Sequence, residues 1–221
     1  MFSSASAVVE VLDGLEDRTR ELDSGFHFFR FRSSILGTIM DSISLAQRFS
    51  TSRTPVREAL IALERHDSLE IEPRRRPRVK SLTSDEVTEV YELRAVLHGL
   101  IAREVALRRS DDDLLLLEDS LQRMRDAGDT NDFFWSQVQF HDRAAGIARD
   151  ATLKRVTYGL GLQVLRLRRT GIGIGDRRLR SLSDHERLLV AYRESDADLA
   201  LALERSLVLA ALTLLKRHER V

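Results

Sequence analysis

Apolar residues recur at helical spacing along the C-terminal two-thirds of the chain. From residue 84 onward they fall every three to four positions, with few alternating β-branched runs and no proline. Because proline interrupts helices, this pattern favours an all-helical segment. It predicts helices at 84–108, 111–126, 130–149, 151–170, 178–194 and 196–219. Serine or threonine followed by acids is expected to cap three of them: Thr83 or Ser84, Ser110 and Ser195.

The first 80 residues follow a different pattern, in which short apolar stretches alternate with turn residues. Helices are expected at 7–22 and 27–36, then a short helix near 42–49, a turn at 50–53 and a helix from about Pro55 to His66. The segment 69–82 contains two of the three prolines of the chain and is typical of a two-stranded hairpin. Helix, turn, helix and hairpin in this order predict a winged helix-turn-helix.

The predicted fold is therefore mainly α and has two domains. Residues 1–80 are expected to form the winged helix-turn-helix, and residues 81–221 an all-α antiparallel helical bundle. Apolar residues make up 43% of the chain and charged residues 32%, which is typical of a folded globular protein. The stretch GIGIGD at 171–176 is expected to be a loop. With no strand before it, it does not indicate a dinucleotide-binding turn.

Composition excludes several other classes of protein. The chain has no cysteine, so disulfides and thiolate zinc sites are ruled out. Its longest apolar runs, such as LVLAALTLL at 207–215, are too short to cross a bilayer, and the N-terminal residues lack the pattern of a secretory signal. We therefore expect a cytoplasmic protein without a membrane partner.

A neutral total charge conceals a basic segment. The chain has 35 basic and 35 acidic residues, but the segment 48–80 carries nine Arg or Lys against five acids. This surplus includes PRRRPR at 73–78, where Arg74, Arg75 and Arg76 stand between prolines. Three consecutive arginines stabilise a fold poorly, whereas on a wing they suit contact with a phosphate backbone.

The stretch TSRTPVREALIALERH, which begins at Thr51, predicts a DNA-reading helix. Val56, Ala59, Leu60 and Leu63 form one buried stripe, with Thr54 as the expected N-cap. Arginines at a helix start oppose the helix dipole, and a surface helix with solvated arginines is the simpler interpretation. If this helix is a recognition helix that enters the major groove with its N-terminus first, the arginines at its start can contact DNA. The residues expected to reach phosphates and base edges are Ser52, Arg53, Thr54 and Arg57.

Residues 44–79, SLAQRFSTSRTPVREALIALERHDSLEIEPRRRPRV, resemble the DNA-binding domain of GntR-type bacterial repressors. Residues 52–60 match the core of that pattern without a gap. The stretch at 81–106 resembles the linker and first helix of the FadR-like subfamily, whose C-terminal domain is an all-helical ligand sensor of the FCD type. The resemblance implies a homodimeric transcription regulator, a repressor, whose affinity for operator DNA responds to a small metabolite.

The chain departs from this family pattern at two places in the DNA-binding domain. The segment 37–52 is about five residues shorter than usual. The usual glycine before the wing is Ser68, and the usual wing-tip glycine falls within RRRPR. The departures affect the segment before the turn and the wing. The recognition helix is unaffected.

Many FadR-like sensor domains bind a divalent metal, such as zinc, nickel or manganese, through one aspartate and three histidines. The matching positions here are Gln137, His141, His185 and Leu207. Only His141 and His185 can ligate, so the resemblance implies an incomplete metal site. Glu186 and Asp142 are each one residue from a matched position and rotated by about 100° around their helices.

The resemblance also implies an effector cavity in the helical domain. The residues expected to bind the effector are Arg94, Gln137, His141 and His185, with Tyr91, His98 and Arg166 as weaker candidates. A buried Arg94 suits a carboxylate ligand. For each of these residues taken singly, packing or surface solvation is the simpler interpretation.

Two other classes of function stay open at this level. A metal-dependent helical hydrolase or oxygenase built on His141 and His185 needs a third ligand, and no acid has convincing spacing. A helical interaction module that has lost DNA binding is supported only by the shortened segment 37–52. We therefore interpret the chain as a regulator and not as an enzyme.

Overall fold

The chain divides into two compact units, Met1–Ser81 and Leu82–Val221, each of which we describe by itself. The computed structural model describes residues 43, 46, 52–65, 69–70, 78–79 and 82–218. The helices predicted at 7–22 and 27–36 lie outside these residues, as do Arg74, Arg75 and Arg76. Among the described residues, no helix is long and apolar enough to cross a membrane.

The N-terminal unit contains the predicted helix and hairpin. Ile43 and Ala46 are helical, and helix α4 spans Arg53–Arg65. Strands β1 (Leu69–Glu70) and β2 (Arg78–Val79) pair antiparallel, with Leu69 opposite Val79. This sequence of elements confirms the predicted winged helix-turn-helix.

Helix α4 starts two residues before the predicted start. Its first residue is Arg53, so the expectation that Thr54 caps the helix is wrong. Pro55 then occupies the third position, which the helix tolerates because the N–H groups of the first turn have no intrahelical acceptor.

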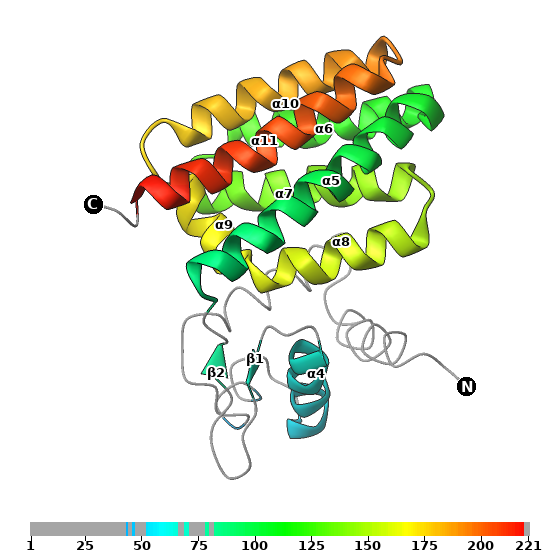
Figure 1. Cartoon of the computed structure of the whole chain (residues 1–221). Coiled ribbons are helices and arrows are strands. Elements are labelled where there is room, and N and C mark those ends of the chain that lie inside the picture. Colours follow the sequence, from blue (N-terminus) through cyan, green and yellow to red (C-terminus); the bar gives the residue numbers. More distant parts are fainter. Residues whose placement is uncertain are drawn as a thin grey trace. The chain divides into compact units, whose positions relative to one another are not determined.

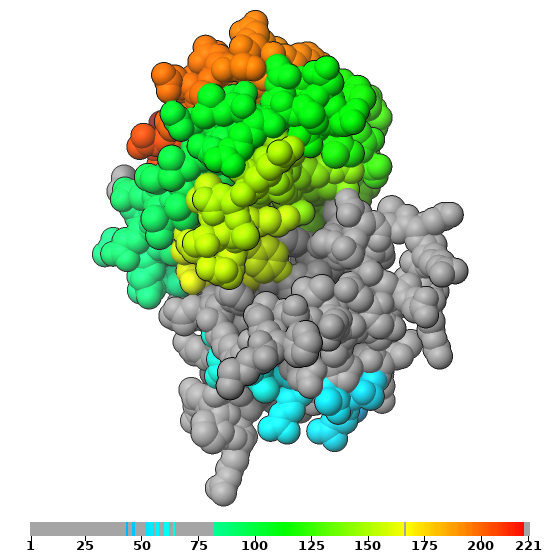
Figure 2. Space-filling view, turned by 90° about the vertical axis from the view of Figure 1, so that its right-hand side faces the viewer, coloured from blue at the N-terminus to red at the C-terminus, as the bar shows by residue number. Residues whose placement is uncertain are grey.

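The C-terminal unit is a bundle of helices (Figure 1). In chain order they are α5 (Ser84–Arg108), α6 (Asp111–Asp126), α7 (Thr130–Ile147), α8 (Ala151–Gln163), α9 (Leu165–Ile172), α10 (Arg177–Arg193) and α11 (Ala197–His218). Figure 1 shows α5 and α11 side by side and antiparallel. Figure 2 shows α8, in yellow-green, on the outer face of this unit. The predicted all-α antiparallel bundle is confirmed.

Capping side chains set several helix starts. Thr83 and Ser110 each form a capping box, with Glu86 and Asp113 respectively. These two starts agree with the sequence prediction. The prediction for Ser195 is wrong, because the Asp196 carboxylate accepts the Leu199 N–H at 2.9 Å and so caps α11. Ser195 instead takes the left-handed conformation, with φ 57°, where α10 ends.

One predicted helix is two helices in the structure. The segment 151–170 divides at Val164, whose φ of −103° and ψ of 13° lie outside the helical region. Gly159 and Gly161 weaken the helix just before this point, since each glycine costs about 1 kcal/mol relative to alanine. Val164 itself is fully buried, in a cluster that joins α5 to α11 through Tyr91, Ala95 and Val208.

The contact between α5 and α11 depends on a glycine. A β-carbon at Gly99 would lie 2.7 Å from Arg205 Cγ and 3.2 Å from the Leu201 carbonyl oxygen. Real β-carbons do not approach other atoms so closely. Gly99 therefore lets the two longest helices of the unit pack backbone to backbone at this level.

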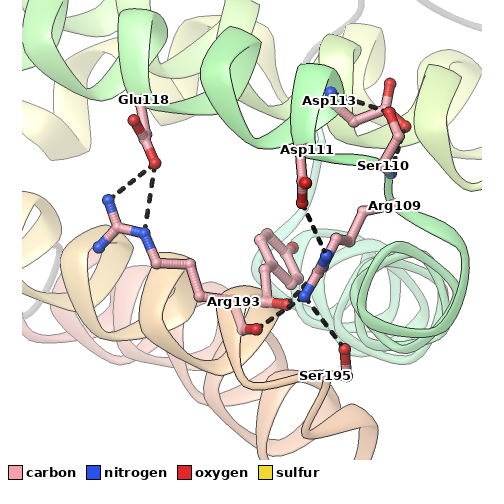
Figure 3. Close-up of polar contacts among 8 residues, drawn as sticks. Arg109, Ser110, Asp111, Asp113, Glu118, Arg193 and Ser195 are labelled. Carbon is pink, nitrogen blue, oxygen red and sulfur yellow. Dashed lines mark hydrogen bonds and ion pairs between the residues drawn. The ribbon is translucent and has the colours of Figure 1, made fainter.

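An arginine side chain closes the end of α10 (Figure 3). The Arg109 guanidinium donates hydrogen bonds to the carbonyl oxygens of Tyr192 at 3.0 Å and Arg193 at 2.7 Å, and to Ser195 Oγ at 3.3 Å. Carbonyl groups at a helix C-terminus have no intrahelical donor, and a cation there interacts favourably with the helix dipole. Arg109 thus connects the end of α5 to the turn between α10 and α11.

Replacing Arg109 with alanine is expected to lower the free energy of unfolding by about 1.5–3 kcal/mol, since it removes charged hydrogen bonds to carbonyl groups. Urea unfolding followed by circular dichroism measures the change. Arg108→Ala is the matched control, because Arg108 is exposed and its one ion pair among the described residues is with Glu104 on its own helix. Equal unfolding midpoints for the two variants would contradict this role of Arg109.

Candidate DNA-binding surface and buried polar site

The start of α4 presents a basic, exposed surface. Ser52, Arg53, Thr54 and Arg57 are all exposed, and the first turn of the helix carries no acid. Val56 and Leu60, from the predicted stripe, are buried and fix which face of α4 points outward. The free N–H groups of the first turn add to the positive end of the helix, and such an end binds anionic groups such as phosphate.

A second polar site is buried inside the helical bundle. Charged or polar side chains, almost all with less than a tenth of their surface exposed, come from four helices: Arg94 and His98 of α5, Gln137 and His141 of α7, Arg177, Ser181 and His185 of α10, and Glu204 of α11. Burying such groups is costly unless they pair with one another or bind a ligand. The cluster is therefore the main candidate site of this unit.

Hydrogen bonds determine which ring nitrogens carry protons. The Ser181 carbonyl oxygen lies 2.6 Å from His185 Nδ1, and because a carbonyl only accepts, Nδ1 carries the proton. Burial lowers the pKa of His185 to about 4, so at neutral pH its other nitrogen, Nε2, is an acceptor. That atom lies 3.4 Å from His141 Nε2, which must then be the donor. Neutral His141 consequently presents the lone pair of Nδ1 on the opposite side of its ring.

Glu204 faces that lone pair. Its Oε1 lies 3.3 Å from His141 Nδ1 and 3.2 Å from His98 Nδ1. Despite these short distances, neither oxygen of the buried carboxylate has an aligned hydrogen-bond partner among the described residues. Burial raises the pKa of Glu204 to about 8, against the opposing effect of Arg94 and Arg168. The carboxylate is thus close to two ring nitrogens without being satisfied by either.

Arg94 and His98 lie one helical turn apart on α5. The Arg94 guanidinium is 3.2 Å from His98 Nε2 and lies over the Tyr91 ring, 5.5 Å from its centroid. Because arginine only donates, Nε2 of His98 accepts, and Nδ1 carries the proton without being aligned with Glu204. Burial and the charge of Arg94 hold the pKa of His98 well below its usual value.

A cavity of about 40 Å³ lies beside this cluster. Arg94, Arg168 and Arg177 line it together with Tyr91 and apolar residues of α9 and α11. A space of this size holds a few waters or a small ligand group.

The cavity has a surplus of positive charge. Burial, aided by the charge of Arg94, lowers the pKa of Arg168 to about 9, which still leaves it charged at neutral pH. Its guanidinium makes no hydrogen bond or ion pair with any residue that the structure describes, and lies 5.7 Å from the Phe134 ring. Arg177 pairs at 3.5 Å with Asp184, whose side chain is partly exposed. Three guanidinium groups therefore face one ionised carboxylate, because Glu204 is largely protonated at neutral pH.

The structure brings most of the predicted effector residues together. Arg94, Gln137 and His141 line the cavity, and His185 contacts His141 from behind. Tyr91 also lines it, and His98 adjoins it through Arg94. The side chain of Arg166 lies outside the described residues. Arg168 and Arg177 were not predicted from the sequence, since neither stands out within the arginine-rich segments around it.

The four positions that match the family metal site do not form a ligand set. The Gln137 amide is engaged with Ser181 Oγ at 3.1 Å, and Leu207 has no donor atom. His141 and His185 lie side by side, but their contact is between Nε2 atoms, on the side of the His141 ring away from Glu204.

Within the described residues, His98, His141 and Glu204 form a group close enough to hold a metal ion, with one ligand atom from each lying within 4.8 Å of the others. Glu204 was not predicted from the sequence as a site residue. A signal for it was available, since Glu204 is an acid within an otherwise apolar helical run.

Together, the fold and the sites define a protein with a helix-turn-helix unit and an all-helical unit that encloses a buried polar site. The FCD domain model matches residues 89–210, more than half of the chain, and the model of the bacterial regulatory proteins of the gntR family matches residues 36–79. The chain belongs to the GntR family of regulators with an FCD domain.

Similar curated proteins carry names of the same kind. An HTH-type transcriptional regulator of Bacillus subtilis, YdhC, is 32% identical over 91 residues, which are 41% of each chain. A gluconate operon transcriptional repressor of Bacillus licheniformis is 31% identical over 109 residues, 48% of this chain and 44% of the repressor. The chain spans about half the length of the curated relatives it matches, from 41% to 62%. These names describe transcription regulators and not enzymes.

A solved structure has the same fold. Escherichia coli McbR/YncC superposes with a TM-score of 0.76 over 99% of this chain and 100% of its own, at 18% identity. At this identity the likeness concerns the fold alone.

Proposed function

We propose that this protein is a ligand-responsive transcription regulator, a repressor, that binds double-stranded operator DNA in the cytoplasm. Residues 1–80 bind DNA, and residues 81–221 bind a small effector and form a homodimer. The observation that carries the proposal is the exposed start of α4, with Arg53 and Arg57 and without an acid in its first turn. Enrichment of one sequence from random duplex DNA tests it. Failure to enrich any sequence would favour the non-binding interaction module.

The residues proposed to contact DNA are Ser52, Arg53, Thr54 and Arg57, with Arg74, Arg75 and Arg76 of the wing. In the major groove, arginine suits bidentate contact with guanine, whereas hydroxyl and backbone N–H groups suit phosphate. DNA then supplies the negative charge that the start of α4 omits.

The wing arginines are expected to contribute affinity that does not depend on sequence. Replacing Arg74, Arg75 and Arg76 with alanine should flatten the dependence of log K on log salt concentration, by about 0.9 for each phosphate that the wing no longer neutralises. Fluorescence anisotropy over a salt series measures the slope on operator and on unrelated duplex. An unchanged slope on both duplexes would refute a phosphate-binding wing.

We propose that the effector is a small anion, such as a carboxylate, bound in the cavity by Arg94, Gln137 and His141, while His185, which was also expected to bind it, supports His141 from behind. The surplus positive charge supports this choice, because Arg94 and Arg168 lack a nearby ionised partner within the part of the chain that the structure describes. Arginine binds carboxylates through two parallel hydrogen bonds and selects them over neutral groups. Arg168 therefore joins the proposed set.

A thermal-shift screen of small mono- and dicarboxylates tests the effector proposal. At least one anion is expected to raise the melting temperature of the wild-type protein, and Arg168→Met is expected to remove most of that shift because it deletes an unpaired cation. Arg187→Met is the matched control, since Arg187 is exposed on α10. An anion that stabilises all three proteins equally would point to binding elsewhere.

The mechanism is a shift between two states. An effector that binds one arrangement of the helical domains better than another changes their populations in proportion to that difference in affinity. In a homodimer, this alters the match between two recognition helices and half-sites spaced by a turn of DNA.

A further inference from the structure

We propose that His98, His141 and Glu204 bind one divalent cation at a site not formed by the positions that match the family ligands. The site joins α5, α7 and α11. It uses Nδ1 of each histidine and Oε1 of Glu204, whereas the matched positions Gln137 and Leu207 contribute nothing.

The two spacings from Glu204 fit a shared cation, and all three ligand atoms lie within 4.8 Å of one another. Glu204 Oε1 lies 3.2 Å from His98 Nδ1 and 3.3 Å from His141 Nδ1. Two ligand atoms that each lie about 2.0–2.2 Å from the same zinc ion are separated by about 2.9–3.5 Å. These contacts therefore have the lengths of neighbouring ligands.

The unsatisfied carboxylate is an independent observation. Glu204 is 2% exposed, and neither of its oxygens has an aligned hydrogen-bond partner among the described residues. A cation that displaces the Glu204 proton into solvent would lie between the carboxylate and the two rings, and would satisfy both the carboxylate and the His141 lone pair that faces it. The donor set of two imidazoles and one carboxylate suits zinc, nickel or cobalt, and is less suited to magnesium or calcium.

The surroundings of His141 already match those of a ligating histidine. In metal sites, the second ring nitrogen of a ligating histidine usually donates a hydrogen bond that fixes its tautomer. Here the Ser181 carbonyl fixes His185, and His185 accepts from Nε2 of His141. His185 is thus a positioning residue, and its role explains why it lies beside His141 without belonging to the triad.

Cation binding has a consequence for Arg94. When Nδ1 of His98 ligates a cation, its Nε2 carries the proton and can no longer accept a hydrogen bond from Arg94. The guanidinium must then leave His98, and it already lines the adjacent cavity. This step rests on the proposed effector site. A bound cation releases Arg94 from His98, so that the guanidinium can bind an anion in the cavity. When no anion is bound, the positive charge of Arg94 weakens cation binding.

The test measures cation affinity of the full chain after dialysis against a chelator. Isothermal titration with Zn²⁺ is expected to show one cation per chain, and the visible spectrum of bound Co²⁺ is expected to report nitrogen and oxygen ligands. Glu204→Gln, His98→Gln and His141→Gln each remove a ligating atom and should weaken binding by more than 100-fold. His185→Leu should weaken it by roughly 10–100-fold. Arg94→Met should strengthen it several-fold, an opposite effect that loss of structure would not produce.

Two matched controls should retain wild-type affinity: Glu186→Gln, an acid of α10 that pairs with Arg125, and His218→Gln, a histidine at the end of α11. Circular dichroism of each metal-free variant verifies the fold. Absence of stoichiometric Zn²⁺ in the wild-type titration would overturn the site. So would wild-type affinity in Glu204→Gln or His98→Gln. Operator binding is measured separately, so failure of the cation site is distinguishable from failure of the proposed regulator.

Discussion

Arg53→Ala and Arg57→Ala are expected to lose specific operator binding while keeping the wild-type fold. Both side chains are exposed at the start of α4, so their truncation leaves no cavity, and the buried Val56 and Leu60 that anchor the helix are untouched. A bidentate arginine–guanine contact contributes about 1–3 kcal/mol of discrimination. Each variant should therefore bind a selected operator roughly 5–150-fold more weakly and approach its affinity for unrelated duplex.

Gel-shift titration on an operator selected from random duplex DNA measures the change. Arg187→Ala is the control, because it removes one exposed arginine from the helical domain and leaves α4 intact. Wild-type affinity in either α4 variant would contradict the proposed recognition surface. Equal losses in Arg187→Ala would show that overall charge, and not position, determines binding.

The metal-free protein is expected to be most stable near pH 6.5 and to lose stability on both sides. Below this pH, the unfolded chain protonates its histidines, whereas the folded state keeps His185 neutral down to a pKa of about 4. The stability from this histidine is lost as pH falls from 6.5 to 4 and amounts to about 3 kcal/mol. His98 and His141, whose pKa values burial also lowers well below 6.5, act in the same direction.

Glu204 acts in the opposite direction. Its pKa rises from 4.5 unfolded to about 8 folded, so its contribution is fully present below pH 4.5 and is lost as pH increases to 8. Between 4.5 and 6.5 the three histidines outweigh it, and above 6.5 only Glu204 changes its protonation among these four groups. Arg168, whose folded pKa is about 9, stays largely charged up to pH 8.

Urea unfolding at pH 5, 6.5 and 8 with a chelator present measures this dependence. The loss from pH 6.5 to 8 should be about 2 kcal/mol in the wild type, and Glu204→Gln should abolish it because glutamine does not titrate. Glu186→Gln, at an exposed ion pair, should retain it. Identical stability of the wild type at pH 6.5 and 8 would contradict a protonated Glu204.

The sequence predicted the bounds of helices in the helical domain correctly where local capping signals were strong. The bounds 84–108 and 111–126 agree with α5 and α6, because Thr83 and Ser110 begin capping boxes that fix each start. The break at Val164 was not predicted. Its environment depends on packing against α5 and α11, which a local pattern does not contain.

The candidate site was predicted in part for a similar reason. Arg94, Gln137 and His141 were found from the family pattern, and the structure places all three at the cavity. Glu204 was missed because its position on α11 has no counterpart in the pattern. Only the packing of α11 on α5, where Gly99 permits close approach, brings its carboxylate to His98.

The place of α5 in the chain has a geometric consequence. This helix begins at Ser84, two residues after the boundary between the compact units, and carries both Arg94 and His98. At 1.5 Å per residue, His98 lies about 21 Å along the axis from the first turn. A tilt of α5 by about 5° around His98 would therefore displace its N-terminus by about 2 Å. A tilt of α5 that is too small to open the bundle at the polar site would therefore displace the start of this helix, which is joined by Leu82 and Thr83 to the N-terminal unit.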